Sequence, residues 1–156
     1  MIPRIAALAL TTALTIPAMA QARPVTLAAR LTNYGGDGAY LAFYLTDAKG
    51  NYVKTIYMAG GRPRYYRHLG DWMRLSNGDY RGLSGITGAS IGSGGLLQVT
   101  VDVADSLIDA GYTLHIDAAA QNFREMPSEI TMPFTSANAN QVQTSRGYIH
   151  AFAYNM

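Results

Sequence analysis

The chain of 156 residues contains no cysteine. This absence excludes disulfides, c-type haem attachment, iron–sulfur clusters and cysteine-ligated zinc, so an electron-transfer role would rely on an organic cofactor. Charged residues are also scarce, at 14% of the chain, against about 25% in typical soluble domains. The net charge of +2 is too small to indicate nucleic-acid binding.

Long hydrophobic runs are also lacking, except for one at the N-terminus. Arg4, the apolar segment 5–16 and the small residues around Ala20 form the pattern of a secretory signal. This run is too short to span a bilayer, and no later run is longer. We therefore predict a signal peptide over residues 1–20 and a single exported domain over residues 21–156. We expect that domain in the periplasm, with no membrane span after signal cleavage.

Apolar and polar residues alternate with a period of two along much of the remaining chain, which is typical of half-buried strands. The turn-forming segment 47–51 separates two such stretches and predicts a hairpin. Short strands joined by glycine-rich turns predict an all-β sandwich. The predicted strands cover residues 25–32, 39–46, 52–58, 96–103, 112–118, 129–134 and 147–154. In the third of these, Ile56 and Tyr57 are expected on opposite faces.

The pattern changes after Gly60-Gly61. Tyr65, Leu69 and Trp72 fall at helical spacing, and Pro63 suits a first helical turn. The sequence therefore predicts one short helix over residues 64–75 between strands. Trp72, the sole tryptophan, is expected to anchor the core.

The segment from Arg81 to Gly95 has six glycines among its fifteen residues. We expect an exposed loop that forms no part of the core, where a ligand or a modifying enzyme approaches the backbone closely. Arginines cluster before and at the start of this loop, so the local field is expected to be positive. They are Arg62, Arg64, Arg67, Arg74 and Arg81.

Within this loop, Thr87-Gly88-Ala89-Ser90 resembles the acceptor motif of extracytoplasmic flavoproteins. In those proteins a flavin transferase links the phosphate of FMN to the final hydroxyl of the motif. The resemblance implies attachment at Ser90, with small neighbours that leave room for the transferase. The predicted cofactor-binding residues are Ser90, Thr87, Gly88, Ala89, Ser84, Gly85 and Arg81, with Ser84 at a position where the motif often has Asp. A second interpretation is that Tyr65, Tyr66 or Trp72 shields the flavin ring.

Four segments together resemble a family of predicted periplasmic proteins of unknown function. They read AFYLTDAKGNYVKTIYM, RYYRHLGDWMR, LSGITGAS and AGYTLHIDAAAQ. The resemblance implies an immunoglobulin-like sandwich encoded beside PepSY-type membrane reductases and flavin transferases, often near outer-membrane iron-uptake receptors. The resemblance also implies that the protein is a flavin carrier.

The leading hypothesis is therefore a non-enzymatic carrier. FMN on Ser90 would relay electrons from a membrane reductase to an envelope acceptor such as a ferric chelate. The alternative is a cofactor-free sandwich that acts as an adaptor in iron uptake.

Hydrolysis is a weaker hypothesis. The segment 88–92 satisfies G-x-S-x-G, and His68, His115 or His150 could complete a triad, but the chain is too short for the fold that this motif requires. No metal site is predicted, because the histidines lack ligand spacing. His115 and Asp117 are expected to form a surface pair.

Overall fold

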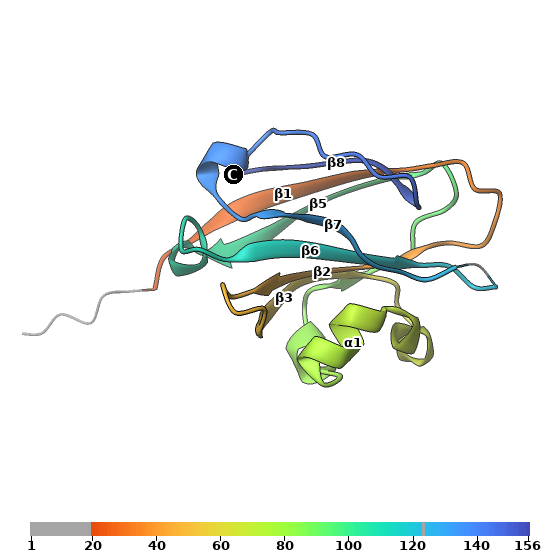
Figure 1. The fold of residues 1–156 in the computed structure, drawn as a ribbon, viewed down its shortest axis with the longest axis horizontal. Helices are drawn as coiled ribbons and strands as arrows, with labels where there is room; N and C mark the ends of the chain where they lie inside the picture. The colour runs from red at the N-terminus through yellow and green to blue at the C-terminus, as the bar shows by residue number, and fades with distance from the viewer. Residues whose placement is uncertain (1–19, 123) are drawn as a thin grey trace, which may run out of the picture.

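The computed structural model describes residues 20–122 and 124–156, which form two β-sheets packed face to face (Figure 1). The signal peptide predicted for residues 1–20 lies outside the described residues, except for Ala20. The predicted all-β sandwich with one short α-helix between strands is confirmed.

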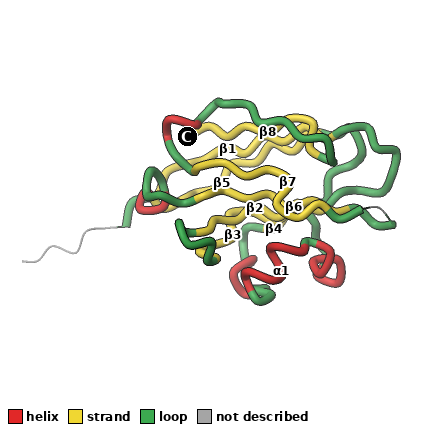
Figure 2. The backbone as a smooth tube through the Cα atoms, in the orientation of Figure 1, coloured by secondary structure: helices red, strands yellow, loops and turns green. Residues whose placement is uncertain are grey.

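The first sheet has three antiparallel strands in the order β5 (Leu96–Ala104), β1 (Ala22–Leu31) and β8 (Ile149–Asn155). The second has five, in the order β4 (Thr87–Gly88), β3 (Tyr52–Ala59), β2 (Tyr40–Thr46), β6 (Thr113–Ala119) and β7 (Met126–Pro133) (Figure 2). All pairs are antiparallel except β3 with β4. Each predicted strand is present, with ends shifted by a few residues.

The main core lies between the sheets. Val25, Leu27 and Ala29 alternate inward along β1 and are fully buried. They pack in one cluster with Phe43 of β2 and Ile116 of β6. The period-two pattern of residues 25–32 therefore identified the inner face of β1 correctly.

A second core lies on the outer face of the five-stranded sheet, under the α-helix α1 (Gly70–Ser76) (Figure 1). Tyr44 and Met58 point into it from the sheet, and Leu69 and Trp72 cover them. Strand β2 is consequently buried on both faces, which explains its nearly continuous apolar sequence. Trp72 is 0% exposed, so its predicted role as a core anchor is confirmed.

The bounds predicted for the short helix, residues 64–75, are wrong. The structure has a 3₁₀ helix over Pro63–His68 and then α1, with Leu69 in a non-helical conformation between them. The buried carboxylate of Asp117 accepts a hydrogen bond from the backbone N–H of Trp72 at 2.7 Å. This bond satisfies one of the free N–H groups at the start of α1 and favours a new helix there.

The expected alternation along β3 is also wrong at its centre. Phe43 pairs with Tyr57 and Tyr44 pairs with Thr55, so Ile56 is an extra residue in the ladder. This β-bulge places Ile56 and Tyr57 together in the main core and returns Met58 to the second core.

The surface pair expected from His115 and Asp117 is wrong as well. Asp117 is 0% exposed and His115 is half-buried, because α1 covers that face of β6. Burial raises the pKa of Asp117. Its carboxylate accepts hydrogen bonds from the hydroxyl of Tyr44 at 3.0 Å and from the N–H of Ser128 at 2.8 Å, in addition to that of Trp72.

Candidate functional site

The glycine-rich segment is not the wholly exposed loop that its composition predicts. Leu83 and Ile91 are buried, and Thr87–Gly88 forms the short strand β4 at the edge of the five-stranded sheet. The sequence does not reveal this strand, because two residues are too few to show a periodic pattern. The many glycines of the segment are typical of an exposed loop.

Two sets of backbone hydrogen bonds hold this segment. On one side, the N–H of Gly60 donates to the carbonyl of Gly88 at 2.8 Å as β4 pairs with β3. On the other side, Ala39 and Ile91 exchange two hydrogen bonds of 2.7 and 2.9 Å. Ala89 and Ser90 connect these two fixed points and are both exposed. Ser90 is therefore presented on a short link that is anchored at both ends.

The side chain of Ser90 lies against Gly38. A Cβ atom added to Gly38 would lie 2.7 Å from the Oγ of Ser90. Two other hydroxyls of the segment are engaged: Thr87 donates to the carbonyl of Leu83 at 3.0 Å, and Ser93 donates to Asn33 at 3.0 Å. Within the part of the chain that the structure describes, the hydroxyl of Ser90 has no hydrogen-bond partner.

Ser90 lines a surface pocket with a volume of about 650 Å³. Ligand pockets typically measure about 300–1,000 Å³. The lining comes from the loop before β2, the 3₁₀ helix 63–68 and the segment after β6. It consists of Asp37, Gly38, Tyr40, Arg62, Tyr65, Arg67, His68, Ser90, Ala119, Ala120, Gln121, Asn122 and Glu125. Two guanidinium groups, two carboxylates, two amides and two phenol rings therefore surround one free serine.

The ring of Tyr65 is held from three directions. It meets Tyr40 edge to face at 5.5 Å between centroids, and Arg64 lies 4.7 Å from its centre. Its hydroxyl donates to the amide oxygen of Gln121 at 3.2 Å. A ring fixed in this way offers a preorganised surface for a planar ligand.

His68 connects two charged residues of the same pocket. Its Nδ1 lies 2.7 Å from a carboxylate oxygen of Glu125, and Arg67 donates to its Nε2 at 3.3 Å. These contacts join the 3₁₀ helix 63–68 to the segment before β7 and close one side of the pocket.

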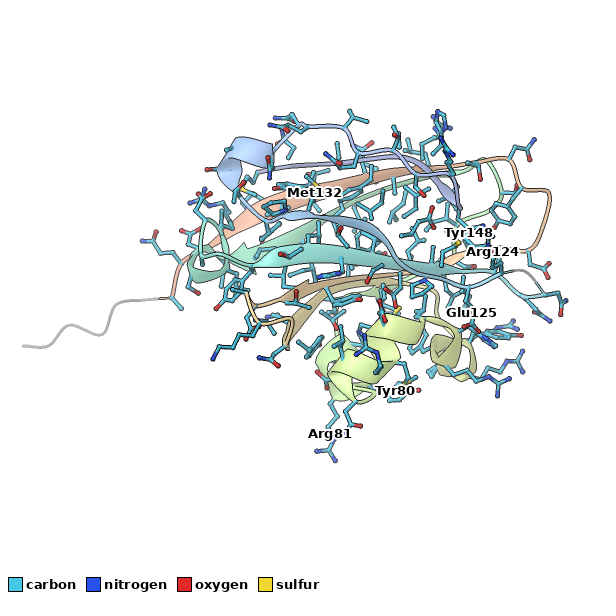
Figure 3. The ribbon with its side chains drawn as sticks, in the orientation of Figure 1. Tyr80, Arg81, Arg124, Glu125, Met132 and Tyr148 are labelled. Atoms are coloured by element: carbon cyan, nitrogen blue, oxygen red, sulfur yellow. The ribbon has the colours of Figure 1, made fainter. Side chains whose placement is uncertain are left out.

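Of the predicted site residues, the pocket lining includes only Ser90. Gly88 instead packs against the hydroxyl of Tyr57, where a Cβ atom would overlap it. Ser84, Gly85 and Arg81 are exposed outside the lining. In Figure 3, Arg81 points away from the body of the molecule beside Tyr80, well apart from Glu125.

Several pocket residues were not predicted from the sequence. Some of them are brought to Ser90 by the pairing of Ala39 with Ile91. Asp37, Gly38 and Tyr40 reach the pocket through that pairing, and Glu125 reaches it after β6. These contacts are distant in sequence and carry no motif. Clustered arginines gave a partial signal, since Arg62 and Arg67 do line the pocket.

The geometry does not favour hydrolysis or metal binding. Ser90 lies between two strand pairings, whereas a G-x-S-x-G nucleophile requires a strand-to-helix turn. No histidine contacts its hydroxyl among residues 20–122 and 124–156. No group of three metal-binding side chains was found among those same residues.

Fold and pocket together define a small β-sandwich protein with a polar surface pocket built around one free serine. Over residues 22–151 the sequence matches the family described as "Predicted periplasmic protein (DUF2271)", and the chain belongs to that family. Searches of curated proteins and of solved structures found no match. The family places the protein in the periplasm. None of the helices in the described part of the chain has the length and apolar character needed to cross a membrane.

Proposed function

We propose that this protein is a periplasmic electron carrier that holds FMN through a phosphodiester bond to Ser90. The observation that carries the proposal is the exposed hydroxyl of Ser90, which has no partner among the described residues and opens into a pocket of about 650 Å³. A covalent bond keeps a redox group in a compartment where lost cofactor is not replaced from the cytosol.

Attachment is a balanced group transfer from FAD, catalysed by a flavin transferase. The Oγ of Ser90 attacks the phosphorus of the FMN half, the phosphoanhydride bond breaks, and AMP leaves. The hydroxyl proton passes to a base of the transferase. Small residues beside Ser90 leave the approach open, because Gly38 and Ala89 add almost no bulk there.

The pocket residues fit such a group chemically. Bound FMN supplies reversible one- and two-electron transfer. Arg62 and Arg67 neutralise the charge of the phosphodiester. Tyr65 offers a ring face for stacking, and Gln121 and Asn122 offer amide groups for the polar edge of a ring.

The proposed partners follow from this chemistry. A PepSY-type membrane reductase supplies electrons, and an envelope acceptor such as a ferric chelate receives them. A pocket at the protein surface is open to both. The protein itself catalyses no bond change in this account.

A second candidate is a cofactor-free adaptor of the cell envelope. It is favoured by one observation: the contact with Tyr57 explains the need for glycine at position 88 without any modifying enzyme. In that case the exposed Arg62, Arg64 and Arg67 would contact a partner protein or an anionic chelate directly.

An in vitro reaction separates the two candidates. The mature protein is incubated with a flavin transferase and FAD, and flavin fluorescence is read on a denaturing gel. We expect a fluorescent band for the wild type and for Ser93→Ala, whose hydroxyl donates to Asn33 outside the pocket lining, and none for Ser90→Ala. A wild-type band without fluorescence would favour the adaptor.

A further inference from the structure

A continuous series of aromatic rings leads from the pocket to the far side of the helical layer. Tyr40, which lines the pocket, lies 6.1 Å from Tyr66 between ring centroids. Tyr66 in turn stacks on Tyr80 at 5.8 Å with an interplanar angle of 18°. Both spacings fall within the roughly 4.5–7 Å typical of direct ring contact.

Trp72 strengthens the outer half of this series. It meets Tyr66 at 5.8 Å and Tyr80 at 6.1 Å, edge to face in both cases. No ring contact joins Trp72 to Tyr40 among the described residues, so Tyr66 is the connection between the pocket and the outer rings.

The inner rings are fixed by the backbone at Gly60. A Cβ atom at Gly60 would overlap the ring of Tyr40, so glycine is needed for that ring to lie there. The hydroxyl of Tyr66 donates to the carbonyl of Gly60 at 2.7 Å. Tyr66 is 2% exposed and burial raises its pKa. The carbonyl of Gly60 accepts this hydrogen bond but is too weak a base to take the proton.

The outer end differs in its environment. Tyr80 is 46% exposed and is one of three large hydrophobic residues with such exposure among those described. Figure 3 shows it beside Arg81 on the outside of the helical layer, away from Glu125 of the pocket. Its side chain is therefore open to contact with a partner protein.

We propose that Tyr40, Tyr66 and Tyr80 form an aromatic relay that conducts single electrons between the Ser90 pocket and a second contact point at Tyr80. The proposal rests on the proposed function, because the redox group stands in the pocket. The partner at Tyr80 is a redox protein, since a small chelate could enter the pocket directly.

The relay makes and breaks no bonds in normal turnover. The donor in the pocket loses one electron, the redox protein at Tyr80 gains it, and the rings between them couple the two without being left oxidised. The arrangement separates the two contact points, so that a donor and an acceptor can bind at the same time.

The cysteine-free chain permits a test that needs no FMN. Ser90→Cys is labelled with a ruthenium photo-oxidant, and a flash with a soluble cobalt(III) quencher removes one electron from the ruthenium. The oxidised metal then takes one electron from the rings, and a tyrosine that loses its proton becomes a radical. A phenol probe traps this radical, and mass spectrometry locates the adduct.

We expect the adduct on Tyr80, and its loss in Tyr66→Leu. Tyr148→Leu is the matched control, because Tyr148 is also a buried tyrosine that donates to a backbone carbonyl, but it lies outside the relay. It should retain the adduct. Tyr80→Leu, a surface change, should lower the total yield without loss of folding.

An adduct on Tyr80 that persists unchanged in Tyr66→Leu, or that never forms, would overturn the relay. Either result leaves the attachment of FMN to Ser90 unaffected, since that bond is measured separately by mass.

Discussion

At two positions beside the site, a residue larger than glycine would clash with a specific neighbouring side chain. Gly38 leaves room for the side chain of Ser90, and Gly88 leaves room for the hydroxyl of Tyr57. Neither has a positive φ angle, so their role is to permit close approach and not an unusual backbone conformation. Substitution at each should therefore have a different and measurable effect.

Gly38→Ala should slow the attachment of FMN. A Cβ atom 2.7 Å from the Oγ of Ser90 forces that hydroxyl to move, and a misplacement of about 1 Å can cost about 100-fold in rate. The rate of flavin incorporation by the transferase measures the effect. Gly92→Ala is the matched control, because its Cβ would meet nothing within 4 Å. Equal rates for the two variants would contradict the role given to Gly38.

Gly88→Ala should lower the free energy of unfolding by about 1–3 kcal/mol, the usual cost of overpacking. The new methyl group would overlap the hydroxyl of the buried Tyr57. Urea denaturation measures the loss. Tyr57→Phe removes that hydroxyl, so the double variant should recover much of the stability. Additive losses in the double variant would show that the overlap is not the cause.

At the scale of elements, the buried polar cluster under α1 fixes the helical layer to the sheet. Asp117 joins β6 to the start of α1 and to Ser128 of β7. Ser128 has a φ of 45° and donates to Asp71 of α1 at 2.7 Å. Since this layer also carries the 3₁₀ helix that lines the pocket, the cluster supports the site indirectly.

Asp117→Asn should destabilise the protein by about 1–3 kcal/mol, because one carboxylate oxygen becomes an NH₂ group that faces a buried donor. Urea denaturation followed by Trp72 fluorescence reports the change, since Trp72 donates its backbone N–H to this carboxylate. Asp105→Asn, which alters a partly exposed ion pair with Arg23, should cost much less. Similar losses for both would argue against a special role for the buried group.

His115 makes this cluster sensitive to pH. Burial lowers the pKa of His115, although Asp117 and Asp71 oppose the shift. A lowered folded-state pKa means that the unfolded chain binds the proton more readily. Its stabilising contribution is therefore complete above the unfolded value of about 6.5 and is lost as the pH falls.

The wild type should thus lose stability relative to His115→Gln as the pH is lowered from about 6.5. The free energy of unfolding of both proteins, measured by urea titration between neutral and mildly acidic pH, gives the difference. A difference that stays constant with pH would rule out His115 as the titrating group.

At the scale of the whole molecule, the sandwich brings the loop before β2, the 3₁₀ helix 63–68 and the segment after β6 around Ser90. Sequence periodicity predicted the strands and most of their inner faces, because alternate residues of a strand point to the same face and pack in the core. It failed at Ile56, where a bulge depends on the partner strand, and at Leu69, where a buried carboxylate from β6 starts a new helix.

The site was predictable only in part. Ser90 could be chosen from a local motif, whereas Tyr40, Gln121 and Glu125 join it through pairings between distant segments. The burial of Asp117 could not be foreseen for the same reason. The strand pattern places Asp117 on one face of β6, but only the position of α1 shows that this face is buried.

Attachment of FMN to Ser90 in the native protein can be read from the mass of one peptide. The protein is isolated from its own periplasm, digested and analysed by mass spectrometry. We expect the peptide containing Ser90 to be heavier by FMN less one water, with fragments that place the group on that serine. An unmodified peptide in cells that contain an active flavin transferase would show that Ser90 does not carry FMN.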